Sequence, residues 1–214
     1  MDKSEEFWDK AANTYDQEED KDEQTHNKII ERTKEYLKIS DIILDYGCGT
    51  GRISNEIAGN VKMIHAIDIS ANMIEIAKQK ADGRKIENID YAHSTLFDER
   101  YERGSYDVIL LFYILHLLEE TPKVMQRINE LLKPGGLIIS VTPCMGEKPF
   151  LSFLLSLVSK IGLVPSVRSF RISELENLIA SGNLETIKTE CLVQSSQQYL
   201  VVAKKVVKTS STAT

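Results

Sequence analysis

The chain has 214 residues, of which 42% are hydrophobic and 27% are charged, as is typical of a soluble protein that forms one domain with a sizeable core. The net charge is −6 and there is no basic stripe interleaved with aromatic residues, which argues against a nucleic-acid substrate. The three cysteines are too few and too scattered for a disulfide framework or a metal site, and the lack of a signal-like segment or a long apolar run predicts a cytoplasmic protein without stable membrane insertion.

Two helical segments are predicted before the first strand. In the first, Phe7, Ala11 and Tyr15 share one face, because residues four apart on a helix are neighbours. An aromatic face of this kind needs another part of the protein to cover it. Residues 16–23 form an acidic run, which is usually a solvated, mobile loop. The apolar stripe from Ile29 to Leu37 then predicts the second helix.

A glycine-rich turn follows the first predicted strand, which is the apolar run 42–44. The turn reads Asp45-Tyr46-Gly47-Cys48-Gly49-Thr50-Gly51 and leads into a helix-compatible run at 53–58. Glycines on alternate positions allow positive φ angles and let a ligand lie against the main chain. A dinucleotide fingerprint would have its third glycine where Arg52 stands, and a Walker sequence is absent. Because Asp45 would repel a phosphate, it favours an amine or another positively charged ligand.

A carboxylate lies near the end of the second predicted strand, residues 61–69. Asp68 follows the last glycine by 68 − 51 = 17 residues. This is close to the distance, roughly 20 residues, at which α/β nucleotide-binding folds place a carboxylate on ribose hydroxyls. Alternatively, Asp68 caps the helix that begins before Met73. The two roles do not exclude each other.

Strands and helices alternate through the rest of the core. We predict a third strand at 86–92, a fourth at 106–112 and a helix at 122–132. A stop and turn at 134–136 precedes a fifth strand at 137–141. Such alternation with short links predicts a doubly wound parallel sheet, in which ligands bind beyond the carboxyl ends of the strands. A helix beginning near Ser173 and a hairpin of strands at 184–192 and 197–203 close the chain.

A strongly apolar segment separates the fifth strand from the last helix. Large apolar residues between Phe150 and Ile161 recur at helical spacing and leave only a narrow polar strip. Two interpretations stay open, a lid over an apolar acceptor pocket and plain packing against the sheet. Attachment to a membrane surface is disfavoured, because the polar strip lacks a row of Lys or Arg.

Together these segments resemble the class I S-adenosylmethionine-dependent methyltransferases, and the opening Phe7-Trp8-Asp9 resembles their small-molecule branch. The resemblance covers about residues 40–143 and implies a Rossmann-like, mostly parallel seven-stranded α/β sheet with a C-terminal antiparallel hairpin. It rests on residues 44–51, 66–70 followed by Met73-Ile74, 105–110 and 131–139.

The resemblance further implies a single methyltransferase domain over residues 1–214. Its expected parts are an N-terminal helical cap at 1–39, a cofactor-binding core at 40–143, a candidate lid helix at 144–168, and a C-terminal helix and hairpin at 169–208.

The same resemblance implies a site for S-adenosylmethionine and its product S-adenosylhomocysteine. Gly47, Gly49 and Gly51 would line the methionine part, with Cys48 contributing backbone only. Asp45 would face the amino group of the cofactor, directly or through water.

The other end of the cofactor would meet residues after the second and third strands. Asp68 would accept hydrogen bonds from both ribose hydroxyls, with Ile69 and Met73 against the adenine or the sugar. Where the family usually has Gly-Asp-Ala, this chain has His93-Ser94-Thr95. A serine hydroxyl accepts a hydrogen bond without charge assistance, so it would hold the adenine amine more weakly.

Two further contacts are implied for the cofactor amine. Leu111 and Phe112, at the end of the fourth strand, occupy the usual position of a backbone carbonyl contact. Tyr15 would lie near the methionine end if the first helix folds over the cleft. Packing of this helix on the edge of the domain is the alternative.

Methyl transfer is an in-line displacement on an activated carbon, so the protein mainly orients the reactants and supplies a base where the acceptor must lose a proton. The candidate bases are His116, His93, Tyr113 and Tyr15, and none is assigned. The apolar surroundings of His116 are more typical of a structural histidine.

The sequence thus predicts methyl transfer to an O, N or C atom of a small, lipophilic or aromatic acceptor. The alternative is a non-catalytic S-adenosylmethionine-binding module, which Ser94 favours. An NAD-dependent dehydrogenase is disfavoured by Gly51-Arg52. The acceptor and the oligomeric state are not predicted.

Overall fold

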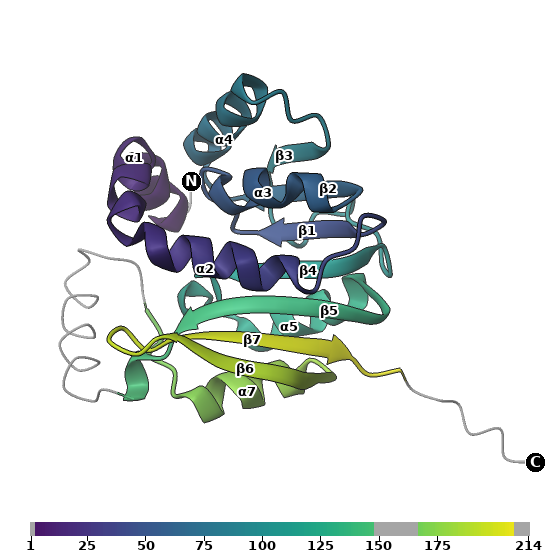
Figure 1. Ribbon diagram of the computed structural model, residues 1–214. Helices are drawn as coiled ribbons and strands as arrows, with labels where there is room; N and C mark the ends of the chain where they lie inside the picture. The colour runs from purple at the N-terminus through teal and green to yellow at the C-terminus, as the bar shows by residue number, and fades with distance from the viewer. Residues whose placement is uncertain (1–2, 148–166, 208–214) are drawn as a thin grey trace, which may run out of the picture.

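A seven-stranded sheet organises the computed structural model, which describes residues 3–147 and 167–207 (Figure 1). The order of the strands across the sheet is β3-β2-β1-β4-β5-β7-β6. Their bounds are β1 (Ile42–Tyr46), β2 (Met63–Asp68), β3 (Ile89–His93), β4 (Tyr106–Phe112), β5 (Leu132–Pro143), β6 (Leu184–Val193) and β7 (Gln198–Lys205).

The pairing of the strands confirms the predicted doubly wound, mostly parallel fold. The five strands from β3 to β5 in this order are mutually parallel, whereas β7 is antiparallel to both of its neighbours, β5 and β6. Since β1 and β4 are adjacent, the chain reverses its direction of winding between them. A crevice opens at such a point outside the carboxyl ends of the strands, which is where ligands bind in open α/β sheets.

Helices cover both faces of the sheet and enclose two apolar cores. On one face α2 (Glu23–Lys34), α3 (Arg52–Ile57) and α4 (Ala71–Gly83) bury isoleucines such as Ile29, Ile57 and Ile74. On the other face α5 (Thr121–Leu131) and α7 (Ile172–Ser181) bury residues such as Met125 and Leu175. The helices predicted near these positions are therefore present.

The acidic run at 16–23 is helical, so the predicted loop was wrong, although most of its described side chains are exposed to solvent as expected. Helix α1 (Lys3–Glu19) includes the first half of this run, a 3-10 turn follows at Asp20–Asp22, and α2 begins at Glu23. Basic partners provide the physical reason. The Asp16 carboxylate lies 2.5 Å from the ammonium of Lys80, and Asp20 lies 2.6 Å from the guanidinium of Arg52. Asp16 and Asp20 thus form ion pairs with a residue of α4 and with Arg52, which directly follows the glycine turn.

The fifth strand is longer than the predicted 137–141. Pairing of β5 with β4 begins at Leu132, opposite Tyr106, and passes through an irregularity before Leu137. Gly135 adopts a φ of +75° there. The predicted stop at 134–136 is therefore a distortion inside the strand, because a glycine can take a left-handed conformation without ending the ladder.

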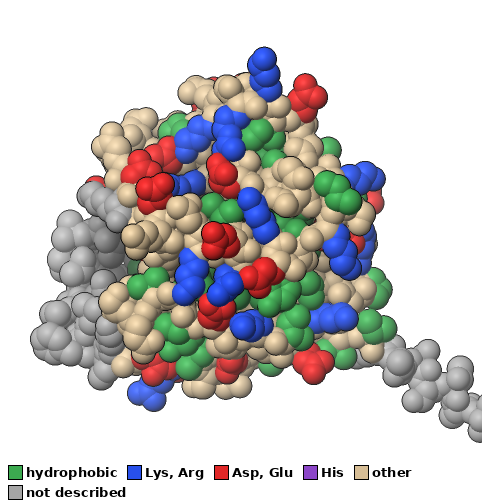
Figure 2. Space-filling model, in the orientation of Figure 1, with side chains coloured by type: hydrophobic (Ala, Val, Ile, Leu, Met, Phe, Trp, Pro, Cys, Tyr) green, Lys and Arg blue, Asp and Glu red, His purple; other side chains and the backbone are tan. Residues whose placement is uncertain are grey.

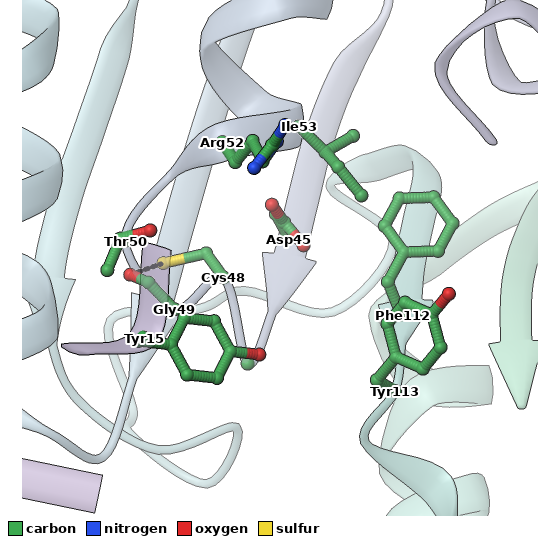
Figure 3. A pocket seen from close by; sticks show the side chains of 10 residues that line it. Tyr15, Asp45, Cys48, Gly49, Thr50, Arg52, Ile53, Phe112 and Tyr113 are labelled. Carbon is green, nitrogen blue, oxygen red and sulfur yellow. Dashed lines mark hydrogen bonds between the residues drawn. The ribbon is translucent and has the colours of Figure 1, made fainter. Parts of the chain in front are cut away.

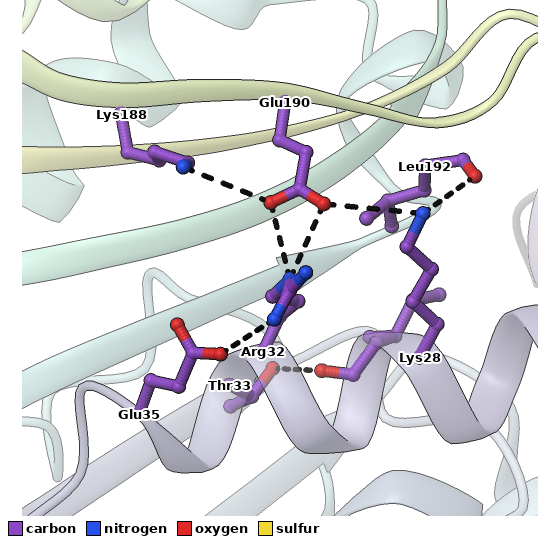
Figure 4. A network of polar contacts seen from close by, with 8 residues as sticks. Lys28, Arg32, Thr33, Glu35, Lys188, Glu190 and Leu192 are labelled. Carbon is purple, nitrogen blue, oxygen red and sulfur yellow. Dashed lines mark hydrogen bonds and ion pairs between the residues drawn. The ribbon is translucent and has the colours of Figure 1, made fainter.

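Charged side chains join α2 to the far edge of the sheet. Glu190 on β6 lies 3.1 Å from Arg32 and 3.9 Å from both Lys28 and Lys188 (Figure 4). Lys28 also donates to the carbonyl of Leu192 at 3.0 Å. Acidic and basic side chains are interspersed over this face of the molecule (Figure 2). The network connects the N-terminal helices to the C-terminal hairpin.

The apolar segment from Phe150 to Ile161, predicted as a lid or as core, lies outside the described residues. No helix within 3–147 or 167–207 is long and apolar enough to cross a membrane.

Candidate functional site

Two adjoining pockets form one cleft at the carboxyl ends of β1, β2 and β4. The smaller, here the turn pocket, surrounds the glycine turn (Figure 3). The larger, here the main pocket, has a volume of about 370 Å³ and continues from the same turn past the end of β2. The residues that line both pockets are Tyr15, Gly47, Gly49, Phe112 and Tyr113.

The glycine turn is built from main-chain contacts. The N–H groups of Gly47 and Cys48 both donate to the carbonyl of Ile67, at 2.8 and 3.0 Å. Gly47, Gly49 and Gly51 all have positive φ angles. A Cβ atom on Gly51 would overlap the Tyr91 ring, since it would lie 2.8 Å from Cζ. Gly51 therefore packs the turn onto β3, whereas Gly47 and Gly49 line the cleft.

Asp68 is anchored by the backbone on both sides. Its Oδ2 accepts from the N–H of Gly49 and its Oδ1 from the N–H of Ser70, each at 2.9 Å. The Ser70 side chain caps α4 by accepting from Met73, so Asp68 is not the N-cap residue. A carboxylate has about four lone-pair sites. Asp68 lines the main pocket beside Ile69 and Met73, where a lone-pair site that the backbone does not use can accept from a ligand.

Asp45 lies deep in the turn pocket with 3% of its surface exposed. Burial raises its pKa to about 7, with a smaller contribution from the charge of Asp68, although the hydroxyl of Ser54 donates to it at 2.6 Å and opposes the rise. Burial also raises the pKa of Asp68. Two carboxylates that are costly to ionise share one cleft, so a cation bound there would be strongly favoured.

Helix α1 forms one wall of the cleft. A Cβ atom on Gly49 would lie 3.6 Å from the ring of Tyr15, and Trp8 lines the main pocket. Asp9 accepts from the Ser70 hydroxyl at 2.6 Å and from the Asn72 N–H at 3.2 Å, and thereby attaches the helix to the start of α4. The two predicted placements of α1, over the cleft and against the domain edge, therefore both describe it.

Aromatic residues at the end of β4 face the glycine turn across the pocket (Figure 3). Phe112 and Tyr113 line both pockets, whereas Leu111 is fully buried in the core beneath them. A backbone contact was predicted for Leu111 and Phe112. The sequence offered Tyr113 only as a candidate base.

The segment after β3 distributes its polar groups differently from the prediction. Thr95 lines the main pocket, whereas Ser94 and Asp98 line an adjoining hollow that shares Ile69, Thr95 and Phe97 with it. The Ser94 hydroxyl donates to Asp98 at 3.1 Å, and Arg100 holds the pKa of Asp98 at about 2. An acid thus lies four residues beyond the position where the family usually has one. Sequence reasoning missed Asp98, although its place shortly after the strand was a usable signal.

Other cleft residues carried no signal in the sequence. Phe97, Leu117 and Leu118 complete the apolar lining of the main pocket. The sequence also did not identify Ser54 as the partner of Asp45.

The candidate histidine bases lie at the margins of the cleft. Burial lowers the pKa of His116 to about 4, its Nδ1 has no hydrogen-bond partner in the described part of the chain, and it does not line either pocket. His93 lies on the outer side of the cleft, 3.4 Å from the carboxylate of Glu5. Within the described ranges, no three side chains of metal-ligand type come together.

The fold, the glycine turn and the paired carboxylates define the class I S-adenosylmethionine-dependent methyltransferase architecture. A family model described as a methyltransferase domain matches residues 37–205, and the chain belongs to this family. The family and the fold, both predicted from the sequence, are thereby confirmed. Membership of the methyltransferase family also supports S-adenosylmethionine as the cofactor.

Individual relatives agree with this assignment. The chain is 32% identical over 118 residues to a demethylmenaquinone methyltransferase of Lactococcus lactis, covering 51% of this chain and 46% of the relative. It is 28% identical over 174 residues to a ubiquinone biosynthesis O-methyltransferase of Rickettsia bellii, covering 78% of this chain and 72% of the relative. The chain spans about half the length of several curated relatives that it matches.

Among solved structures, the chain resembles a geranyl diphosphate C-methyltransferase of Streptomyces coelicolor in complex with Mg²⁺, geranyl diphosphate and S-adenosylhomocysteine. The TM-score is 0.67 at 13% identity, with 79% of this chain and 74% of the other covered. At this identity the likeness concerns the fold alone.

Proposed function

We propose that this chain transfers the methyl group of S-adenosylmethionine to a small, lipophilic or aromatic acceptor. The observation that carries the proposal is the cleft itself, in which bare glycine main chain lies between two buried carboxylates. The cofactor has a positively charged amino group, a positively charged sulfur and a ribose diol. Asp45 would pair with the amino group, the glycine turn would lie against the sulfur, and Asp68 would accept from the ribose diol.

The two pockets suggest how the cofactor lies. The nucleoside would occupy the main pocket, with its ribose on Asp68 and its adenine between Ile69, Met73 and Thr95. The length of the cleft would then place the methionine part in the turn pocket, against Gly47 and Gly49 and near Asp45. Supporting roles are proposed for Tyr15, Cys48, Gly51, Ser94, Leu111 and Phe112.

Ionic attraction would hold the charged end in place. In the buried environment of Asp45 a cation interacts more strongly than it would in water. The gain is realised only when the carboxylate is ionised, so binding would release a proton wherever Asp45 is protonated beforehand. The sulfonium carries its own leaving group, so the protein needs mainly to align an acceptor with the methyl carbon.

The apolar character of the acceptor is proposed from the aromatic wall formed by Phe112, Tyr113 and Tyr15. Relatives named for demethylmenaquinone and for ubiquinone biosynthesis are consistent with a ring-containing acceptor. The proposed division of the domain keeps the cap at 1–39 and the core at 40–143, since residues of both line the cleft.

The alternative is a module that binds S-adenosylmethionine without turnover. This alternative is motivated by Ser94, which stands where the family usually has an acid and whose hydroxyl donates to Asp98. Calorimetry with S-adenosylmethionine and with S-adenosylhomocysteine would test binding first. Incubation with a panel of phenols, quinols, amines and thiols, followed by assay of S-adenosylhomocysteine, would then test transfer. Binding without any product would favour the module, and lack of binding would reject both functions.

A further inference from the structure

The segment that joins β3 to β4, residues 94–105 and here the β3–β4 loop, forms one side of the cleft. Neither a helix nor a strand occurs in this described segment. Thr95 and Phe97 line the main pocket, and Ser94 and Asp98 line the adjoining hollow. Long irregular connections in compact domains usually carry function, and their backbone groups need hydrogen-bond partners other than a regular ladder. The contacts that hold this loop therefore bear on the shape of the cleft.

One guanidinium group holds the loop from α5. Arg127 donates from Nε to the carbonyl of Leu96 at 3.1 Å and from Nη2 to the carbonyl of Tyr101 at 2.8 Å. A longer contact, of 3.5 Å, joins Nη2 to the carbonyl of Asp98. The guanidinium has five N–H donors in a rigid fork, so it can bridge several carbonyl groups at once. Arg127 thus fixes the loop at three points along its backbone.

The same face of α5 makes a second contact with the loop. The ammonium of Lys123 lies 5.2 Å from the centroid of the Phe97 ring. Lys123 and Arg127 are neighbours on the helix, because they are four residues apart. Glu120 and Val124, at the start of this helix, line the main pocket. The loop and the first turns of α5 are therefore joined where both of them border the pocket.

Inside the loop, Asp98 is a further brace. Its carboxylate accepts from the Ser94 hydroxyl at 3.1 Å, from the N–H of Arg100 at 3.0 Å and from the Nε of Arg100 at 2.9 Å. An exocyclic amine donates hydrogen bonds, whereas an oxo group only accepts them. A loop edge that presents a carboxylate and a hydroxyl therefore favours a base with an amine, provided that the loop is held in place.

We propose that Arg127 is a positioning residue for the adenine of the cofactor. It holds the β3–β4 loop where Thr95 and Phe97, with the polar groups of the hollow beside them, meet the base. This inference rests on the proposed function, which places the adenine beside Ile69, Met73 and Thr95. Arg127 acts on the base only through the loop. Without the fork the loop would sample other positions, and the distinction between adenine and a base that lacks the amine would weaken.

The test compares two ligands that differ in one group of the base. S-adenosylhomocysteine carries the 6-amino group of adenine, and S-inosylhomocysteine carries an oxo group in its place. Calorimetric titration gives the dissociation constant of each for the wild type and for Arg127→Leu. We expect the wild type to prefer the adenosyl ligand, and the variant to lose roughly two- to tenfold of this preference. A general loss of stability would weaken both ligands alike and leave their ratio unchanged.

Two further variants sharpen the result. Arg127→Lys decides the question if Arg127→Leu does not fold. Lysine keeps a positive charge near Glu130, which lies 3.6 Å from Arg127, but its donors share one nitrogen that cannot span three carbonyl groups, so this variant should also lose preference. Arg103→Leu is the matched control, since Arg103 lies 3.4 Å from the same Glu130 with 76% of its side chain exposed. It should leave the preference unchanged.

Each outcome decides a different question. An unchanged preference in both variants of Arg127, an equal loss in Arg103→Leu, or equal binding of the two ligands by the wild type would overturn the role of Arg127, even if S-adenosylhomocysteine binds normally. Failure of the wild type to bind S-adenosylhomocysteine would overturn the proposed function, and this inference with it.

Discussion

Replacing Asp68 by asparagine tests the cofactor site most directly. The carboxylate accepts from the N–H groups of Gly49 and Ser70, and the proposed ribose hydroxyls would use its remaining lone-pair sites. Asparagine has one carbonyl oxygen and an amide group that only donates. At least one hydroxyl would lose its acceptor, and the other would lose charge assistance. Hydrogen bonds to charged groups contribute about 1.5–3 kcal/mol each, so loss of one predicts affinity lower by roughly 10- to 150-fold.

The assay is calorimetric titration with S-adenosylhomocysteine, which does not decompose through methyl loss. Asp41→Asn is the matched control. Asp41 is also a buried carboxylate that accepts from a backbone N–H, that of Lys38 at 2.8 Å. It directly precedes β1, so it lies at the amino end of that strand, away from the cleft at the carboxyl ends. It should lower the free energy of unfolding and leave affinity intact. Unchanged affinity in a folded Asp68→Asn protein would refute the assignment of the ribose to Asp68.

The pKa of Asp45 predicts how stability depends on pH. Its pKa of about 7 in the folded protein exceeds the ordinary value of 3.8, so between these values the folded state binds more protons, and its stability falls as pH rises. Asp45→Asn should therefore be more stable than the wild type at pH 8 and lose that advantage at pH 5. Thermal melts of the two proteins that show no such pH dependence would contradict the raised pKa of Asp45. Gly51→Ala and Gly104→Ala both place alanine at positive φ, but a new Cβ meets Tyr91 only at Gly51. In denaturant unfolding, Gly104→Ala should cost about 1 kcal/mol and Gly51→Ala about 1–3 kcal/mol more, and equal costs would count against the close packing.

The sequence was most informative where local chemistry and function coincide. The glycine turn and Asp68 could be recognised because glycine adopts positive φ without steric cost, and because one helix and one strand separate the turn from the carboxylate. The fourth strand was predicted at its observed bounds, since a run buried on both faces reads as continuously apolar.

The remaining features depend on contacts between distant segments. The acidic run at 16–23 is helical because its charges meet Lys80 and Arg52, which the local pattern does not contain. The partnership of Tyr113 with Gln198 likewise arises only when β7 inserts beside β5. Gly135 lies in the irregular stretch between the pairs Tyr106–Leu132 and Val108–Leu137, so a glycine that reads as a stop lies inside a strand whose pairing with β4 resumes after it.

The reversed direction of β7 has a consequence for the order in which the site is assembled on the ribosome. The residues proposed to bind the methyl donor, from Asp45 to Thr95, emerge early and belong to neighbouring strands β1, β2 and β3 or follow them directly. Gln198 is synthesised near the end of the chain, and the hydrogen bond that the Tyr113 hydroxyl donates to it forms only when β7 pairs with β5. A contact of a residue that lines the cleft is therefore completed by the last strand to be made.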